Sequence, residues 1–112
     1  MIFRSYKTEA TKENPHKIDV KQLYDDDSAQ IMHITLQPQE SLMPHKTPVD
    51  VTFYILEGTP TVHIGDESQT FEKDVLVESP ANTTHYLSNN GCTKARILVI
   101  KAPKPKSQTK LL

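Results

Sequence analysis

The stretch Val51-Thr52-Phe53-Tyr54-Ile55-Leu56-Glu57-Gly58 is the most strand-like run in this sequence. It is rich in β-branched and aromatic residues, shows no helical spacing of apolar residues and ends at a glycine. Alternation places Val51, Phe53 and Ile55 on one face of the predicted strand. His45 lies shortly before this strand and His85 lies well after it. We therefore predict that the strand forms the floor of a pocket that these two histidines share.

Further short strand-like segments lie on both sides of this run. They are separated by Pro, Gly, Asn and Asp residues, and no window shows apolar residues at helical spacing. In the segment 31–36, alternation directs Ile34 and Leu36 inward and His33 and Thr35 outward. Gly65-Asp66 is a hairpin signal, and Asn89-Asn90-Gly91 is a stronger one. The pattern predicts an all-β sandwich or barrel. The segments expected to be strands are 18–21, 31–36, 51–56, 61–64, 69–71, 75–77, 85–87 and 95–100.

Length and composition narrow the class of protein. A chain of 112 residues with a formal charge of −1 is expected to be one domain with no nucleic acid or membrane as partner. The single cysteine, Cys92, excludes an intrachain disulfide. The N-terminus has no apolar signal region, and no apolar run is long enough to span a bilayer. We expect a cytoplasmic protein.

The two ends of the chain differ from its centre. Residues 1–30 are expected to form an N-terminal arm and the first strands, with Ile2, Phe3 and Tyr6 able to pair onto a sheet edge. The core domain is expected to cover residues 31–102. From Lys101 the lysines are spaced by prolines, and residues 103–112 are predicted to be a solvated basic tail.

A first motif surrounds the central strand. Gln39, His45, Thr47, Val51 and Gly58 have the spacing of the pattern G-x5-H-x-H-x3,4-E-x6-G. His45 and Gly58 match that pattern. Gln39 occupies the first glycine position, Thr47 occupies the second histidine position and Val51 occupies the glutamate position.

A second motif lies downstream. Asp74, Pro80, Asn82, His85 and Asn89 have the spacing of G-x5-P-x-G-x2-H-x3-N. Pro80, His85 and Asn89 match, while Asp74 and Asn82 replace the two glycines. Asn tolerates the left-handed backbone conformation better than most residues. With these two motifs, residues 31–102 resemble the small single-domain cupins of the cupin-2 type.

The resemblance implies an all-β, cupin-type double-stranded β-helix or jelly-roll barrel. It also implies a metal-binding site inside the barrel. Cupins of this type hold a metal ion with three histidines and a glutamate, a set suited to Ni, Zn, Fe or Mn. Here His45 and His85 remain, whereas Thr47 and Val51 leave two ligand positions vacant. We expect one weakly bound divalent ion or none. The pocket is expected to be lined by Val51, Phe53, Ile55, Val62, Leu87 and Asn89.

Several functions remain open at this point. The first is a small-molecule-binding cupin of unknown specific function with a degenerate, weak metal site. The alternatives are a metal-assisted dioxygenase or isomerase acting on a small polar organic substrate, and a metal-free binding or sensing module. The two histidines could also serve as acid–base groups without metal, but alternation places the candidate partners Tyr86 and Tyr54 on the opposite face from His85 and from Val51. His16 and His63 are predicted to be surface residues. A homodimer is expected, because apolar residues lie on both faces of the strands.

Overall fold

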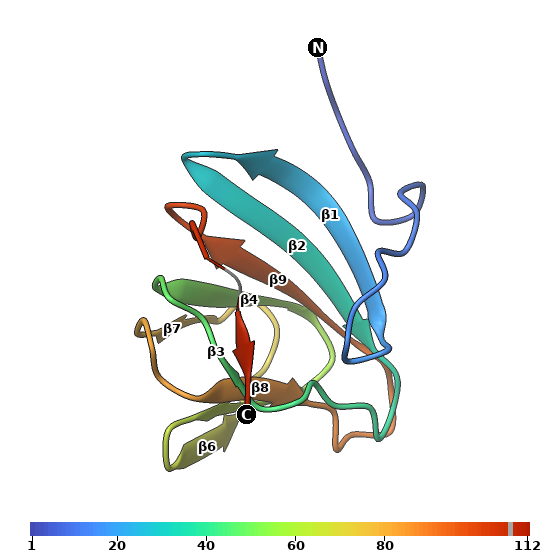
Figure 1. Ribbon diagram of the computed structural model, residues 1–112. Coiled ribbons are helices and arrows are strands. Elements are labelled where there is room, and N and C mark those ends of the chain that lie inside the picture. Colours follow the sequence, from blue (N-terminus) through green and yellow to red (C-terminus); the bar gives the residue numbers. More distant parts are fainter. Residues whose placement is uncertain (108) are drawn as a thin grey trace.

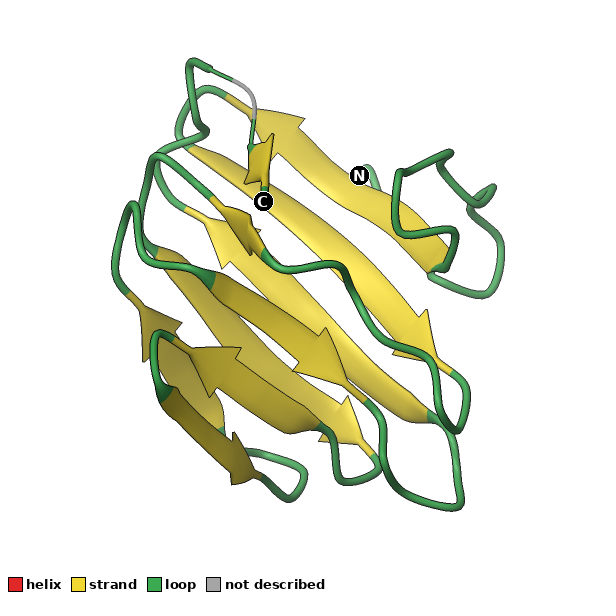
Figure 2. Cartoon of the chain, turned by 60° about the horizontal axis from the view of Figure 1, so that its bottom comes forward, coloured by secondary structure: helices red, strands yellow, loops and turns green. Residues whose placement is uncertain are grey.

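Two antiparallel sheets face each other in the computed structural model, which describes residues 1–107 and 109–112 (Figures 1 and 2). The first sheet has the order β1-β2-β9-β4-β7 and the second has the order β10-β3-β8-β5-β6. β8 and β9 follow each other in sequence but lie in different sheets, as in a jelly roll. The strands are β1 (Asp19–Asp26), β2 (Ala29–Leu36), β3 (His45–Lys46), β4 (Val51–Glu57), β5 (Thr61–Ile64), β6 (Glu67–Thr70), β7 (Leu76–Ser79), β8 (His85–Ser88), β9 (Ala95–Lys101) and β10 (Lys110–Leu111).

The central stretch behaves as its alternation predicts. β4 lies between β9 and β7 in the first sheet. Val51, Phe53 and Ile55 are at most 1% exposed, and they face the second sheet as part of the core. Gly58 directly follows β4; its φ is +77°, and an added Cβ would lie 2.5 Å from the carbonyl oxygen of Lys94. Only glycine fits this close approach between the end of β4 and the start of β9.

Three non-glycine residues with positive φ confirm the motif register. Gln39, Asp74 and Asn82 occupy the glycine positions of the two motifs, and their φ angles are 73°, 67° and 60°. The backbone therefore keeps the left-handed turns of the pattern although the side chains have changed. Such a conformation costs a non-glycine residue roughly 1 kcal/mol.

The outer face of β2 is covered by the N-terminal arm. His33 faces outward as predicted, but it is buried rather than exposed. The Tyr6 ring stacks on His33 with centroids 4.3 Å apart, and the Arg96 guanidinium lies 4.3 Å from the Tyr6 centroid. The arm thus packs across a sheet face. Among the described residues it adds no strand to a sheet edge, and Ile2 and Phe3 are exposed.

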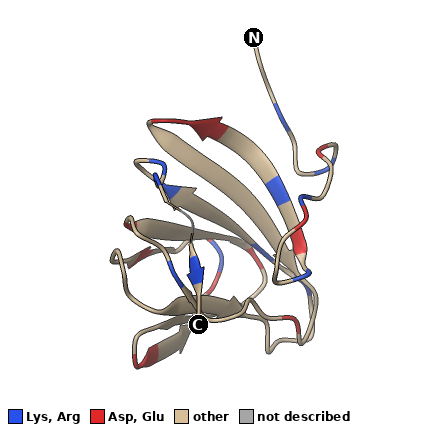
Figure 3. Cartoon of the chain, viewed as in Figure 1, with Lys and Arg blue, Asp and Glu red and all other residues tan. Residues whose placement is uncertain are grey.

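The C-terminal tail returns to the second sheet. Lys104 forms an ion pair with Asp25 at 2.8 Å, next to the acidic turn after β1 (Figure 3). Lys110 and Leu111 then form β10, in which Leu111 is the cross-strand partner of His45. The tail therefore pairs with the second sheet at β10, while β10 itself is exposed, in agreement with a solvated tail.

Two local predictions differ from the structure, while one is confirmed. The Asn89-Asn90-Gly91 segment connects strands of different sheets, so it is a crossing loop and forms no hairpin. Leu76, predicted to be in a buried strand, is 51% exposed because alternation along β7 places it on the same outward face as the exposed Glu78. The hairpin at Gly65 is confirmed, since β5 pairs with β6.

Candidate functional site

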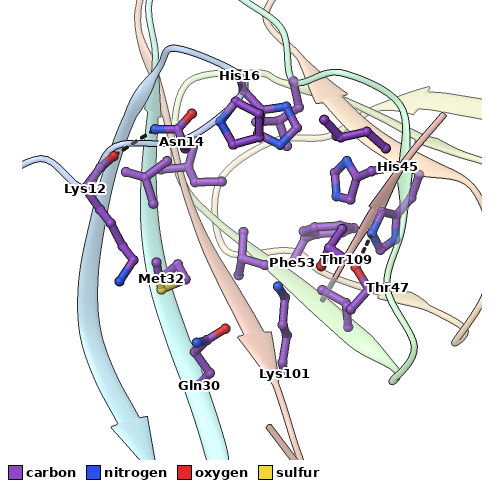
Figure 4. Close-up of a pocket in the computed structure, with 18 residues that line it drawn as sticks. Lys12, Asn14, His16, Gln30, Met32, His45, Thr47, Phe53, Lys101 and Thr109 are labelled. Carbon is purple, nitrogen blue, oxygen red and sulfur yellow. Dashed lines mark hydrogen bonds between the residues drawn. The ribbon is translucent and has the colours of Figure 1, made fainter. Parts of the chain in front are cut away.

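A cavity of about 440 Å³ opens between the two sheets (Figure 4). Its walls come from β1, β2, β4 and β9 of the first sheet and from β3 and β8 of the second. Arm residues 12 and 14–16 and tail residues 109 and 111 complete the lining. Segments near both ends of the chain, outside the two motifs, therefore contribute to the site.

His45 and His85 lie together at one side of this cavity. They are cross-strand partners on β3 and β8, and their ring centroids are 4.6 Å apart. Phe53 packs its ring edge-on against His85, at a centroid distance of 5.4 Å. The structure thus brings together the two histidines that the motif spacing predicts, above the central strand β4.

Both ring nitrogens of His85 are occupied. Its Nδ1 lies 2.6 Å from the Ser79 hydroxyl, and its Nε2 lies 3.2 Å from the Thr47 hydroxyl. Burial, His45 and Lys101 together lower the pKa of His85 to about 4. His85 is therefore neutral at pH 7.

His16 joins these two histidines, contrary to the prediction that it is a surface residue. Its ring centroid lies 5.2 Å from that of His45, and it lines the cavity. The Met43 amide donates a hydrogen bond to His16 Nδ1 at 2.7 Å, while His45 Nδ1 donates to the Met43 carbonyl oxygen at 2.7 Å. Burial lowers the pKa of His16 to about 4 and also lowers the pKa of His45.

The backbone of Met43 therefore assigns opposite tautomers to the rings of His16 and His45. An amide N–H can only donate, so His16 Nδ1 accepts and the proton of the neutral ring is on Nε2. A carbonyl oxygen can only accept, so His45 carries its proton on Nδ1 and a lone pair on Nε2. His16 presents a donor and His45 presents an acceptor.

Lys101 is the second residue that the sequence patterns did not place in the site. The inward alternation of Ala95, Ile97 and Val99 along β9 continues to Lys101, which points into the cavity toward Phe53 (Figure 4). Burial lowers the pKa of its ammonium group. The alternation could have identified this side chain, but the basic composition of the following residues suggested a solvated tail.

Lys101 lies directly across the ladder from Val51, which occupies the glutamate position of the motif. Among the described residues, no carboxylate lines the cavity and no acidic group forms an ion pair with Lys101. The site thus has a cation beside the position where a metal-binding barrel would have an anion.

The other predicted pocket residues divide into two groups. Thr47, Val51 and Phe53 line the cavity. Ile55, Val62 and Leu87 are buried in the core and are not part of its lining. Asn89 has a structural role, because its amide donates to the carbonyl oxygens of Leu36 and Thr93 and its oxygen accepts from the Gly91 amide.

Comparison with known proteins agrees with this geometry. Residues 32–101, more than half of the chain, match the family model described as Cupin domain. The chain is a member of the cupin family. No curated protein matches the sequence significantly. Among the described residues, no helix is long and apolar enough to cross a membrane.

Solved structures share the fold of this cupin. TT1209 from Thermus thermophilus is 25% identical, with a TM-score of 0.79 over 94% of this chain and 100% of its own. An RmlC-like cupin from Methanocaldococcus jannaschii is 25% identical, with a TM-score of 0.77 over 95% of each chain. The polyketide cyclase RemF from Streptomyces resistomycificus is 15% identical and covers 100% of this chain and 85% of its own, with a TM-score of 0.85. At that identity, the likeness to RemF concerns the fold alone.

The side chains of this cupin do not fit the complete metal shell of the family. His45 Nε2 has a free lone pair, but His85 Nε2 is bonded to Thr47, and the proton on His16 Nε2 prevents coordination there. Val51 offers no donor atom, and the Lys101 ammonium opposite it repels a cation. In the described part of the chain, no cluster of three or more His, Cys, Asp or Glu side chains is arranged to hold a metal ion. Metal binding through His45 and His85 remains a prediction.

Proposed function

We propose that this cupin binds a small, mainly apolar organic anion in the barrel, with the Lys101 ammonium group as its charge partner. The observation that carries the proposal is Lys101, a partly buried cation in a cavity whose described lining has no carboxylate. Taking an ammonium group out of water is costly unless a counter-ion accompanies it. A carboxylate on the ligand would supply that counter-ion.

The other polar groups favour an anion as well. With lowered pKa values, His16, His45 and His85 are neutral at pH 7, so they add hydrogen-bonding capacity without negative charge. Lys12, the other cationic residue of the lining, stands at the arm side of the cavity and donates to Gln22 at 3.2 Å. Every charged side chain among the described lining residues is therefore basic.

The walls indicate the character of the rest of the ligand. Val20, Met32, Ile34, Phe53 and Val99 present apolar surface from the first sheet, and Leu42 adds more from the segment before β3. Pockets with mainly apolar walls and a few polar groups are typical of small-molecule sites, and about 440 Å³ lies in their usual size range. An aromatic or branched aliphatic acid fits this description better than a sugar.

The experiment compares three ligands of nearly equal shape. Benzoate, benzamide and benzylamine are titrated into metal-free protein, and amide and methyl NMR signals report binding to the cavity. We expect benzoate to bind at least tenfold more tightly than benzamide, because a hydrogen bond to a charged group contributes about 1.5–3 kcal/mol. Benzylamine should bind least, since its charge repels Lys101.

Three results of the same titrations would contradict the proposal. Equal binding of benzoate and benzamide would show that charge does not decide recognition. Preference for benzylamine would reverse the proposed polarity of the site. Shifts outside the cavity-lining residues would place the ligand elsewhere.

A further inference from the structure

We infer that His45 and His16 form an acid–base pair that catalyses proton transfer next to a carbonyl group of the bound anion. This inference rests on the proposed function, since it uses Lys101 to hold the carboxylate of the substrate. The substrate class would be small apolar 2-oxo acids, and the reaction would be enolisation, giving keto–enol tautomerisation or a shift of a double bond.

The tautomers of the two rings are fixed. A free neutral imidazole exchanges its proton between both nitrogens, so either nitrogen can be the base. Here the two backbone groups of Met43 hold His16 with its proton on Nε2 and His45 with its lone pair on Nε2. The pair therefore offers one donor and one acceptor that cannot exchange roles.

Both Nε2 atoms are also open to the cavity. None of the hydrogen bonds among the described residues uses Nε2 of either ring, and the one buried side-chain atom without a partner is Nδ1 of His33, outside this site. Both rings line the cavity on the same side, with centroids 5.2 Å apart (Figure 4). A donor and an acceptor held this close can act on adjacent atoms of one small molecule.

The chemical step balances without an oxidant or a metal. His45 Nε2 takes a proton from the carbon next to the carbonyl, and the C–H electron pair becomes the C=C bond of the enolate. The carbonyl π pair moves to oxygen, where His16 Nε2–H donates a hydrogen bond to the developing negative charge. His45 then returns its proton, either to the enolate oxygen or to a carbon atom, and the ring becomes neutral again.

Groups around His45 and His16 support the base and the donor in their roles. When His45 becomes an imidazolium, its Nδ1–H keeps the hydrogen bond to the Met43 carbonyl oxygen, which stabilises the positive charge. His16 remains a neutral donor, because its Nδ1 accepts the hydrogen bond from the Met43 amide and its proton is therefore on Nε2. A neutral imidazole can polarise a carbonyl group in this way without transferring a full proton.

The test follows α-proton exchange of phenylpyruvate in D2O by ¹H NMR. Wild-type protein should remove the methylene signal at least 100-fold faster than buffer, as expected for general-base catalysis. His45→Gln should lose at least 100-fold of this rate and His16→Phe at least 10-fold, while both variants still bind benzoate in the cavity, as NMR titration shows. His63→Gln is the matched control, since His63 stacks on Tyr86 and bonds Ser88 outside the cavity.

The outcomes separate the two proposals. If phenylpyruvate binds to the wild-type protein but its α-protons exchange no faster than with the His45→Gln variant, the catalytic inference is overturned and the binding proposal stands. If neither benzoate nor phenylpyruvate binds in the cavity, the binding proposal and the catalytic inference are both wrong. Long-range ¹⁵N–¹H spectra of the wild type give a readout independent of any variant. Protons on Nε2 of His16 and Nδ1 of His45 support the inference, and the opposite pair of tautomers overturns it.

Discussion

Replacement of Lys101 by methionine should weaken anion binding and at the same time stabilise the protein. Methionine has a similar length, so it retains the packing of the Lys101 side chain against Val51 and the other apolar walls while removing the charge. Loss of a charged hydrogen bond of about 1.5–3 kcal/mol predicts that benzoate binds roughly 10- to 150-fold more weakly.

The stability gain follows from the lowered pKa of Lys101. Because the folded-state pKa lies below the unfolded value, the unfolded chain binds more protons between these two values, and stability rises with pH in that window. Below the folded pKa, the ammonium group therefore carries its full destabilising cost. Replacing a charge of this kind by an apolar side chain should add about 1 kcal/mol or more, which raises Tm by about 4 °C for a domain of this size.

The assay combines benzoate titration with thermal and urea unfolding at pH 7 and again above pH 10. The gain in stability should shrink at the higher pH, where wild-type Lys101 becomes neutral. Lys73→Met is the control, because Lys73 is exposed and remote from the cavity lining. A Lys101→Met variant that is less stable than wild type and binds benzoate equally well would refute the reasoning.

Three other properties can be tested on the same protein. Gln39→Gly should raise the free energy of unfolding by about 1 kcal/mol, since Gln39 has a φ of 73° where glycine is unstrained. Urea unfolding measures this change, and a loss of stability would mean that the Gln39 side chain contributes more than the strain costs. Zn²⁺ or Ni²⁺ held through His45 and His85 should be substoichiometric and removed by EDTA, whereas full occupancy that survives EDTA would contradict the incomplete donor set. The chain should form a homodimer, since β1 and β7 are sheet edges and Leu76 is exposed on one of them; a monomer mass by light scattering at micromolar concentration would reject this.

The barrel could be predicted largely from local patterns. The alternation of β4 identifies its buried face because a strand buried on one side alternates with period two. The spacing of His45 and His85 predicts their meeting because each lies at a fixed place relative to a recognisable strand or turn. Gln39, Asp74 and Asn82 show that even the replaced glycine positions keep their backbone conformation.

The missed residues depend on contacts that no local pattern encodes. His16 reaches the site through an irregular arm, and its hydrogen bond to Met43 joins residues 27 positions apart. Such a segment has no periodicity, so composition made it look like a solvated arm. Tyr6 covers His33 for the same reason, by packing across a sheet rather than pairing with a strand. Lys101 differs, since the alternation of β9 includes it, but the lysine-rich residues after it favoured the wrong interpretation.

The most direct test of the anion site is the titration of Lys101 itself, followed through its ε-carbon signal in ¹³C NMR with and without saturating benzoate. We predict a pKa below the ordinary lysine value in the free protein, because burial disfavours the charged form. We also predict that benzoate raises this pKa, because a bound carboxylate stabilises the ammonium group. A Lys101 that titrates at the ordinary value and does not respond to benzoate would contradict the proposed anion site.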